Sequence, residues 1–229
     1  MREPTIQTEK AAPACWECKA ALDGASAEAH FCPQCGKIQP LPPQTTYFSF
    51  FGLPRKLDLE AAELERQFHQ LSWQLHPDRF HNASAYEREL SLERTAVLND
   101  AFRTLRDPVD RVEYLLGLEG VRKEGEVKQQ APPDLLEEVF ELNEHLEELR
   151  AAKRSGGEGR ELDELRHRLE KTREAFQQKL DAVLAELTAQ FPAWDQQGDR
   201  AALLRLSEIL NRHSYIRNLV RNVTEELET

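Results

Sequence analysis

The sequence predicts an all-α protein built from three parts: a small cysteine-rich module, a helical hairpin and a C-terminal three-helix bundle. Four cysteines all lie before residue 36, in two close pairs that indicate a metal-binding module. Apolar residues recur every three or four positions through most of the remaining chain, which is typical of amphipathic helices. Proline-rich and polar stretches separate the periodic segments, so we expect parts at residues 1–43, 44–120 and 134–229, with a linker at 121–133.

The composition narrows the classes of function. A net charge of −11 argues against nucleic acid as the main partner, because phosphate binding depends on clustered lysine and arginine, and it favours basic protein partners. No apolar run approaches the ~20 residues that cross a bilayer, and the amino end lacks the apolar core of a secretory signal. We therefore expect a cytoplasmic protein, or one of the mitochondrial matrix if a transit peptide precedes this numbering.

The cysteines follow the spacing C-x2-C-x13-C-x2-C. Two such turns can bring four thiolates to one tetrahedral Zn²⁺, and a closed set of four ligands predicts a structural site. A pair of disulfides is the alternative, which a cytosolic location disfavours, and redox chemistry or iron binding also remain open. Gly36 follows the second pair, whereas Lys19 occupies the matching place after the first. The predicted zinc ligands are Cys15, Cys18, Cys32 and Cys35.

The hairpin is predicted from two long periodic helices. A proline-rich stretch ends near residue 43, and a short aromatic helical turn begins at Tyr47. The first long helix is expected to start with Asp58 as its N-cap, and the second runs through "SAYERELSLERTAVLNDAFRTLRDP". A shorter helix follows, with Asp107 as its cap and Gly120 as its stop. The expected apolar faces comprise Ala61, Leu64, Phe68, Leu71 and Leu75 in the first long helix, and Leu98, Ala101, Phe102 and Leu105 in the second.

The loop between the two long helices carries the tripeptide His76-Pro77-Asp78 and should lie at the tip of the hairpin. With the aromatic turn before it and "LNDAFRTLRDP" after it, the stretch from about residue 46 to 118 resembles the J-domain of DnaJ-type co-chaperones. The ending "RVEYLLGLEG" resembles the HscB-type subfamily of iron–sulfur cluster assembly, some members of which carry a zinc knuckle pair. The resemblance implies that the tripeptide, with Arg79, binds a DnaK- or HscA-type chaperone and stimulates its ATPase.

The residue types suit such a binding turn. Pro77 ends the helix, His76 offers hydrogen-bond donors, and Asp78 offers a carboxylate suited to a partner arginine. We expect no enzyme activity from this chain, because no serine, cysteine or second carboxylate has the spacing of a catalytic set. Trp73 departs from the subfamily, in which an arginine is usual at this place, so docking is expected to depend more on Arg79 and apolar contact.

Three further helices are expected to form the C-terminal bundle, each with an apolar seam. His213 falls on the third seam, where a hydrogen-bonded core histidine is favoured over a metal ligand. The seams are Leu135, Val139, Leu142, Leu146 and Leu149; then Leu162, Leu165, Leu169, Phe176, Leu180, Val183 and Leu187; and finally Leu206, Ile209, His213, Ile216, Val220, Val223 and Leu227.

A second stripe lies beside the first seam. Leu136, Phe140, Glu144 and Glu148 recur every four residues, and the stripe could widen the buried face at its apolar end and be solvated at its acidic end. The resemblance instead implies binding of an IscU-type iron–sulfur scaffold, although Glu137 stands where an apolar residue is found in the family. The implied scaffold-binding residues are Leu136, Phe140, Glu141, Glu144, Glu148 and Tyr215.

Two other classes of function remain open. A general J-domain protein would use its bundle to bind unfolded clients or to self-associate. An enzyme that uses zinc is a third class, and zinc removal without loss of co-chaperone activity would dismiss it.

Overall fold

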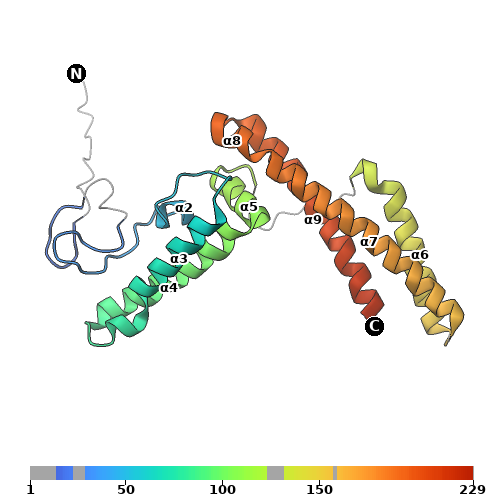
Figure 1. Cartoon of the computed structure of the whole chain (residues 1–229), viewed down its shortest axis with the longest axis horizontal. Helices are drawn as coiled ribbons and strands as arrows, with labels where there is room; N and C mark the ends of the chain where they lie inside the picture. Colours follow the sequence, from blue (N-terminus) through green and yellow to red (C-terminus); the bar gives the residue numbers. More distant parts are fainter. Residues whose placement is uncertain (1–13, 23–28, 123–131, 157–158, 229) are drawn as a thin grey trace, which may run out of the picture. The chain divides into compact units, whose positions relative to one another are not determined.

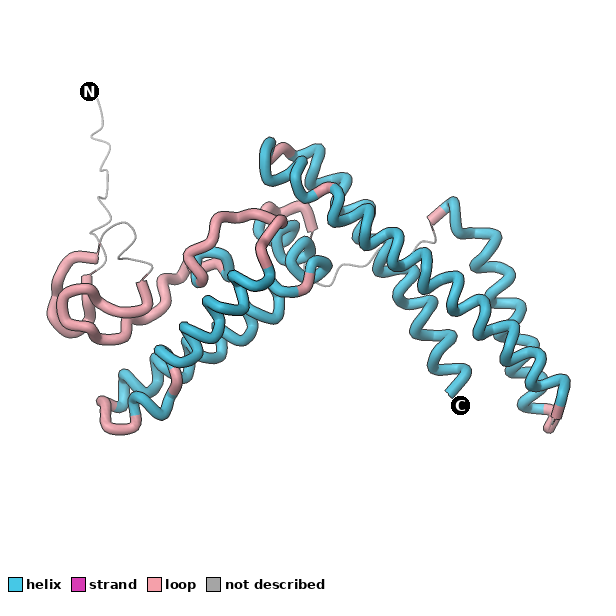
Figure 2. The backbone as a smooth tube through the Cα atoms, in the orientation of Figure 1, coloured by secondary structure: helices cyan, strands magenta, loops and turns pink. Residues whose placement is uncertain are grey.

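The computed structural model of the 229-residue chain describes residues 14–22, 29–122, 132–156 and 159–228. Helices dominate these ranges, and β-structure within them is limited to the isolated bridges Ala14–Ala21 and Phe31–Ile38 (Figure 2). The predicted all-α fold class is therefore confirmed. Within the same ranges, no helix combines the length and hydropathy that crossing a bilayer requires.

The chain divides into two compact units. The first contains the residues up to Arg55 together with Leu59–Asp107, and the second contains Lys56–Asp58 and all residues from Pro108 onward. The cysteine module therefore groups with the hairpin. The helix α5 (Pro108–Leu118), which we expected at the end of the hairpin domain, groups with the bundle because it packs against the last helix.

The first unit is an antiparallel hairpin with a short helix packed on it. It contains α2 (Tyr47–Phe50), α3 (Ala61–Leu75), the 3₁₀ turn η1 (Pro77–Phe80) and α4 (Ala85–Arg106), and α3 and α4 lie side by side (Figure 1). Both α2 and α4 start with a capping box, in which the first residue before the helix and the third within it bond reciprocally. The buried core includes Phe48, Phe50, Leu64, Leu75, Leu90, Leu98, Ala101 and Leu105.

The predicted start of α3 was wrong. The helix begins at Ala61 with Glu60 as its N-cap, which makes no side-chain capping bond. Asp58 instead belongs to the second unit, where its backbone N–H donates to Oδ2 of Asp195 at 2.9 Å. Ala61, expected on the buried face, is exposed, because it occupies the first turn of the later-starting helix.

Among its described residues, the second unit contains α5, the turn η2 (Pro133–Leu135) and four further helices. These are α6 (Leu136–Arg154), α7 (Arg160–Ala189), α8 (Phe191–Gln197) and α9 (Arg200–Glu228). Gly120, at φ +64°, follows α5 as predicted. The long helices α6 and α9 both pack on α7, and the buried seam residues are Leu135, Leu142, Leu146, Leu149, Leu169, Phe176, Val183, Leu187, Leu206, Ile209, His213, Ile216 and Val223.

The short helix α8 was not predicted. Pro192 lies in its first turn, Gly198 at φ +61° ends it, and Phe191 and Trp194 bury their side chains. Its Asp195 carboxylate accepts the backbone N–H groups of Leu57 and Asp58 at 2.8 and 2.9 Å, so α8 ties this short segment to the bundle.

Candidate functional site

The two cysteine turns have the same backbone geometry. The carbonyl of Cys15 accepts the N–H of Lys19 at 3.1 Å, and the carbonyl of Cys32 accepts the N–H of Gly36 at 2.9 Å. Lys19 and Gly36 both have left-handed backbones, with φ of +61° and +71°. A lysine therefore adopts in the first turn the conformation that glycine adopts freely in the second. The symmetry of the backbone brings the two pairs of sulfurs face to face.

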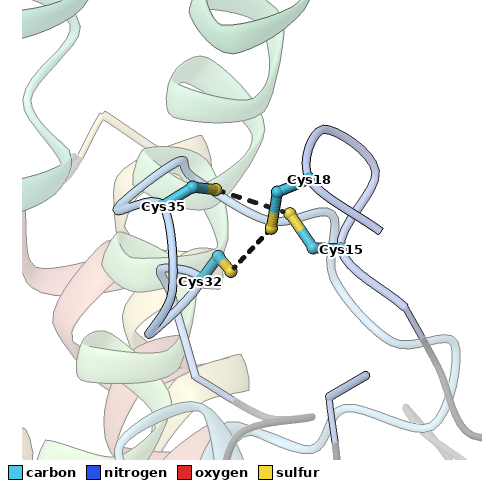
Figure 3. A group of neighbouring side chains, drawn as sticks. All are labelled: Cys15, Cys18, Cys32 and Cys35. Atoms are coloured by element: carbon cyan, nitrogen blue, oxygen red, sulfur yellow. Dashed lines mark hydrogen bonds between the residues drawn. The ribbon is translucent and has the colours of Figure 1, made fainter. Parts of the chain in front are cut away.

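The four predicted ligands come together (Figure 3). All their Sγ atoms lie within 4.8 Å of one another, with Cys15 and Cys35 3.7 Å apart and Cys18 and Cys32 also 3.7 Å apart. A tetrahedral ZnS₄ centre with Zn–S bonds of about 2.3 Å has sulfur–sulfur edges of about 3.8 Å. A disulfide needs about 2.05 Å, and all four thiols are free. The cluster thus fits one tetrahedral metal ion and does not fit two disulfides.

The thiols also influence one another's protonation. Burial would raise the pKa of Cys15, but hydrogen bonds from the backbone N–H groups of Cys18 and Glu17 outweigh it, and this pKa falls to about 6. The N–H of Lys37 lowers the pKa of Cys35, yet burial and the three neighbouring thiols raise it to about 12. Four thiols this close cannot all ionise without a cation to offset their charge, which is the protonation behaviour expected of a metal site.

The cysteine module is fastened to α4 by a buried arginine. Arg94 has no exposed surface, and its Nε donates to the carbonyl of Gln39 at 2.6 Å while Nη2 donates to that of Pro40 at 3.2 Å. Its Nη1 lies 2.5 Å from Nδ1 of His30. Burial, with the nearby Arg94 charge, lowers the pKa of His30 to about 4. The module therefore sits on the hairpin through specific polar contacts.

A second set of contacts lies at the start of α4. Lys37 Nζ is 3.0 Å from a carboxylate oxygen of Glu87, which is itself buried and part of the capping box. The rings of Trp16 and Tyr86 meet edge to face with centroids 4.9 Å apart. These contacts were missed from the sequence. The available signal was Arg94 itself, which stands four residues before Leu98 in the apolar register of α4.

The tripeptide His76-Pro77-Asp78 lies on an exposed turn between α3 and α4, as the sequence predicted. His76 Nδ1 accepts the N–H of Asp78 at 3.3 Å, and the N–H of Arg79 donates to the His76 carbonyl at 3.0 Å. The side chains of His76 and Asp78 are 54% and 90% exposed. The backbone is thus ordered while both polar side chains face solvent.

Hydroxyl groups of α4 hold the end of α3 in place. The carbonyl of Leu75 accepts from Oγ of Ser91 at 2.6 Å and from Oγ1 of Thr95 at 3.2 Å. Leu75 itself is fully buried. The exposed turn therefore starts from a fixed helix end.

The second stripe of α6 lies outside the bundle core. Leu136 and Phe140 are 55% and 72% exposed, whereas the neighbouring seam residue Leu142 is buried. Glu141, Glu144 and Glu148 are exposed as well. Of these acids, Glu148 lies 3.3 Å from the guanidinium of Arg168 on α7, so part of its charge is already balanced.

Tyr215 lies on α9 and is half-buried. Both α6 and α9 run antiparallel to α7 (Figure 1), and Arg150 and Lys153 of α6 bond to Glu226 of α9 at 2.7 and 3.1 Å. Tyr215 precedes Glu226 by eleven residues, or about 16 Å of helix. The same step back along α6 from Arg150 and Lys153, the partners of Glu226, reaches residues 139–142. Tyr215 is therefore level with Phe140 along the bundle.

Comparisons with known proteins agree with this architecture. Residues 131–224 match the family described as the HSCB C-terminal oligomerisation domain. The chain is 35% identical over 186 residues to the co-chaperone protein HscB homolog of Aromatoleum aromaticum, covering 81% of this chain and 95% of that one. It is 33% identical over 135 residues to the iron-sulfur cluster co-chaperone protein HscB of Mus musculus, covering 59% of this chain and 58% of that one.

A solved structure is similar over almost the whole chain. The crystal structure of human co-chaperone protein HscB superposes with a TM-score of 0.71 at 25% identity, covering 93% of this chain and 98% of that one. The match to the Aromatoleum relative covers nearly all of that protein, and the bundle, the hairpin and the cysteine cluster are all present here. This protein belongs to the HscB family of co-chaperones.

Proposed function

We propose that this protein stimulates the ATPase of a DnaK- or HscA-type chaperone through His76, Pro77 and Asp78, with Arg79, and delivers an IscU-type iron–sulfur scaffold to it. The relative from Mus musculus is named an iron-sulfur cluster co-chaperone, which supports this class of function. Hydrolysis of ATP belongs to the chaperone, and this chain contributes binding surfaces.

The chemistry of the exposed turn supports chaperone binding. Asp78 presents a carboxylate that is 90% exposed, on a backbone held by the bonds to His76. A carboxylate can accept two parallel bonds from an arginine, and a backbone that is already held loses little freedom on binding. The rigid end of α3 fixes the direction in which the turn faces.

The single observation that carries the delivery proposal is the exposure of Leu136 and Phe140 beside a buried seam. A phenylalanine that is 72% exposed contributes little to folding, and aromatic residues of this kind anchor interfaces when a partner covers them. Glu141 and Glu144 lie on the same helix and would attract a basic scaffold surface. Tyr215 would extend this surface from α9.

The two sites belong to different compact units of one chain, His76 to the first and Phe140 to the second. Binding of both partners to one polypeptide raises the local concentration of each for the other. This arrangement suits delivery and needs no further contact between the partners.

We further propose that Cys15, Cys18, Cys32 and Cys35 hold Zn²⁺. The cation would neutralise the thiolates and cross-link the two turns, and four protein ligands leave no open position for catalysis. In this chain the metal would stabilise the module that Arg94 and Lys37 fasten to α4.

The proposed function is tested with purified chaperone, scaffold and co-chaperone. The protein should raise the steady-state ATPase rate of the chaperone, and His76→Gln should abolish this stimulation with a change in stability below about 0.5 kcal/mol, because the side chain is exposed. Scaffold binding by the His76→Gln variant should be unchanged. If the variant stimulated normally, or unfolded, the tripeptide would serve only to end the helix and would not bind the chaperone.

Self-association is a second candidate, favoured by the description of the matching family as an oligomerisation domain. A second copy would compete with the scaffold for the exposed apolar pair Leu136 and Phe140. Sedimentation equilibrium of the wild type and of the double alanine variant separates the two occupants, since only self-association gives a dimer that the double substitution removes.

A further inference from the structure

Trp73 is exposed beside the tripeptide. It stands in the last turn of α3, three residues before His76, and 65% of its surface is in contact with solvent. Leu75, two positions later, is fully buried, so the two side chains leave the helix on roughly opposite sides. A single exposed apolar residue is common and needs no explanation by itself. Its contact with Arg79 gives it a function.

The guanidinium of Arg79 lies over the Trp73 ring, 3.8 Å from the ring centroid. This is a cation–π arrangement, in which the electron-rich face of the indole attracts the positive charge. Arg79 directly follows Asp78, whose carboxylate would attract the same guanidinium. Among the ion pairs of the described residues, Asp78 forms none with Arg79; its carboxylate lies 3.6 Å from Nδ1 of His76, the nitrogen that accepts the Asp78 N–H.

The backbone of the turn cannot separate these two opposite charges. The Asp78 N–H bonds to His76, and its carbonyl lies 2.8 Å from Nδ1 of His81, so Asp78 and the start of Arg79 are held in one place. With the backbone held, the separation of the two charges depends on the directions of the side chains, above all that of the long Arg79 side chain. The indole of Trp73 determines that direction.

We propose that Trp73 is a positioning residue for chaperone docking. Its ring holds the Arg79 guanidinium away from the Asp78 carboxylate, which leaves Asp78 to bind an arginine of the ATP-driven chaperone and presents Arg79 to an acidic group beside that arginine. This inference rests on the proposed function. In this proposal, the stacked pair of Trp73 and Arg79 contacts the acidic surface of the chaperone, in place of basic residues along α3.

The charges of α3 support an acidic partner group opposite Arg79. Arg66, the other arginine between residues 61 and 80, already bonds to Glu63 through Nε at 2.9 Å and Nη2 at 2.5 Å. Glu63 therefore balances the charge of Arg66. Arg79 is left as the cation at the turn that meets an aromatic ring in place of a carboxylate.

The stacking is tested first in the free protein by NMR. The ring current of Trp73 should shift the Arg79 side-chain proton resonances upfield. Trp73→Ala should remove this shift, and Trp73→Tyr should retain part of it. Unshifted Arg79 resonances in the wild type would overturn the inference before any chaperone is added.

The role in docking is tested by a double-mutant cycle on chaperone ATPase stimulation. Trp73→Ala should raise the co-chaperone concentration for half-maximal stimulation about tenfold with little change in the maximal rate, and Trp73→Tyr should stay within about twofold of the wild type. Adding Arg79→Gln to Trp73→Ala should cause no further loss, because Arg79 has already lost its docking position once the indole is removed. Leu204→Ala, an exposed apolar position on α9, serves as the control and should behave as the wild type.

The outcomes separate this inference from the proposed function. If the Trp73 and Arg79 effects multiply, or if Trp73→Ala behaves as the wild type while His76→Gln abolishes stimulation, the positioning role fails and the proposed function stands. If the wild type stimulates no such chaperone, both fail together.

Discussion

Nη1 of Arg94 lies 2.5 Å from Nδ1 of His30, in the buried contact between α4 and the cysteine module. A guanidinium has donors only, so Nδ1 accepts and the imidazole is neutral with its proton on Nε2. That Nε2–H in turn donates to the carbonyl of Phe50 at 3.1 Å. One arginine thereby determines the tautomer of a histidine and connects the module, α4 and the end of α2.

Arg94 should be critical for the stability of the first unit. We expect Arg94→Met to lower the free energy of unfolding by about 2–4 kcal/mol, because it leaves the buried carbonyls of Gln39 and Pro40 without their donor. Arg103→Met on the same helix, where the side chain is exposed, should cost less than about 0.5 kcal/mol. Urea unfolding measures both values. Equal effects would show that Arg94 fills space and does not fasten the module.

Removal of one metal ligand should affect the module and spare the bundle. The purified protein should contain one zinc per chain by elemental analysis, and Cys32→Ser should reduce it sharply, because three thiolates leave the tetrahedral site open. The far-UV circular dichroism should change little, since the described residues of the module contain no helix. A metal-free protein in which the four thiols form two disulfides would contradict the site.

Leu136 and Phe140 should matter for the scaffold and not for folding. Changing both to alanine should weaken scaffold binding by about 2 kcal/mol or more, the scale of interface hot spots, as measured by calorimetry. The unfolding midpoint should hardly move, because both side chains are exposed. Leu142→Ala, on the buried seam of the same helix, is the opposite case and should cost about 2–5 kcal/mol in stability. A large drop in stability with unchanged scaffold affinity in the double variant would show that both residues belong to the bundle core and do not bind the scaffold.

The acids of α6 should act mainly on the rate of association. Glu144→Lys should slow association with a basic scaffold several-fold at low salt, and the difference should shrink as salt is added. Glu148→Gln should have a smaller effect than Glu144→Gln, because Arg168 already offsets part of the Glu148 charge. Stopped-flow mixing at two ionic strengths checks both statements. A change confined to the dissociation rate would argue against a role of these acids in attracting the scaffold electrostatically.

The link between α6 and α9 should weaken in acid. A hydrogen bond from Arg150, reinforced by Lys153 and opposed by burial, lowers the pKa of the Glu226 carboxyl below its ordinary value of 4.5. Because the pKa is lower in the folded state, the stabilisation is complete above about pH 4.5 and is lost as the pH falls through the folded pKa. Glu226→Gln should therefore destabilise the protein by about 1 kcal/mol at pH 7 and by less near pH 3, because the carboxylate is lost as the pH falls through the folded pKa.

Urea unfolding at the two pH values measures this difference. Glu225→Gln is the matched control, since its carboxylate is exposed and lies 3.8 Å from Arg221. If the two substitutions had equal effects at pH 7, the destabilisation would come from the change in net charge and not from the loss of the bonds to Arg150 and Lys153.

The sequence by itself determined the features that depend on near neighbours. The cysteine spacing and the tripeptide after Leu75 are motifs of a few neighbouring residues. The apolar seams of α6, α7 and α9 recur every three or four residues, and helical geometry converts such spacing directly into a shared face. The exposure of Phe140 was left open, because its position beside the seam is compatible with either a wide core or a binding stripe.

Only the tertiary structure decided the contacts between distant segments. Arg94 meets Gln39 across 55 positions, and Leu57 meets Asp195 across 138. Asp58 lies in the same segment that Asp195 holds, three positions before α3 begins, and the packing of α5 on α9 explains why that helix leaves the hairpin unit. A hydrogen bond between remote groups leaves no periodic trace in the chain, since its partners become neighbours only after the helices have packed.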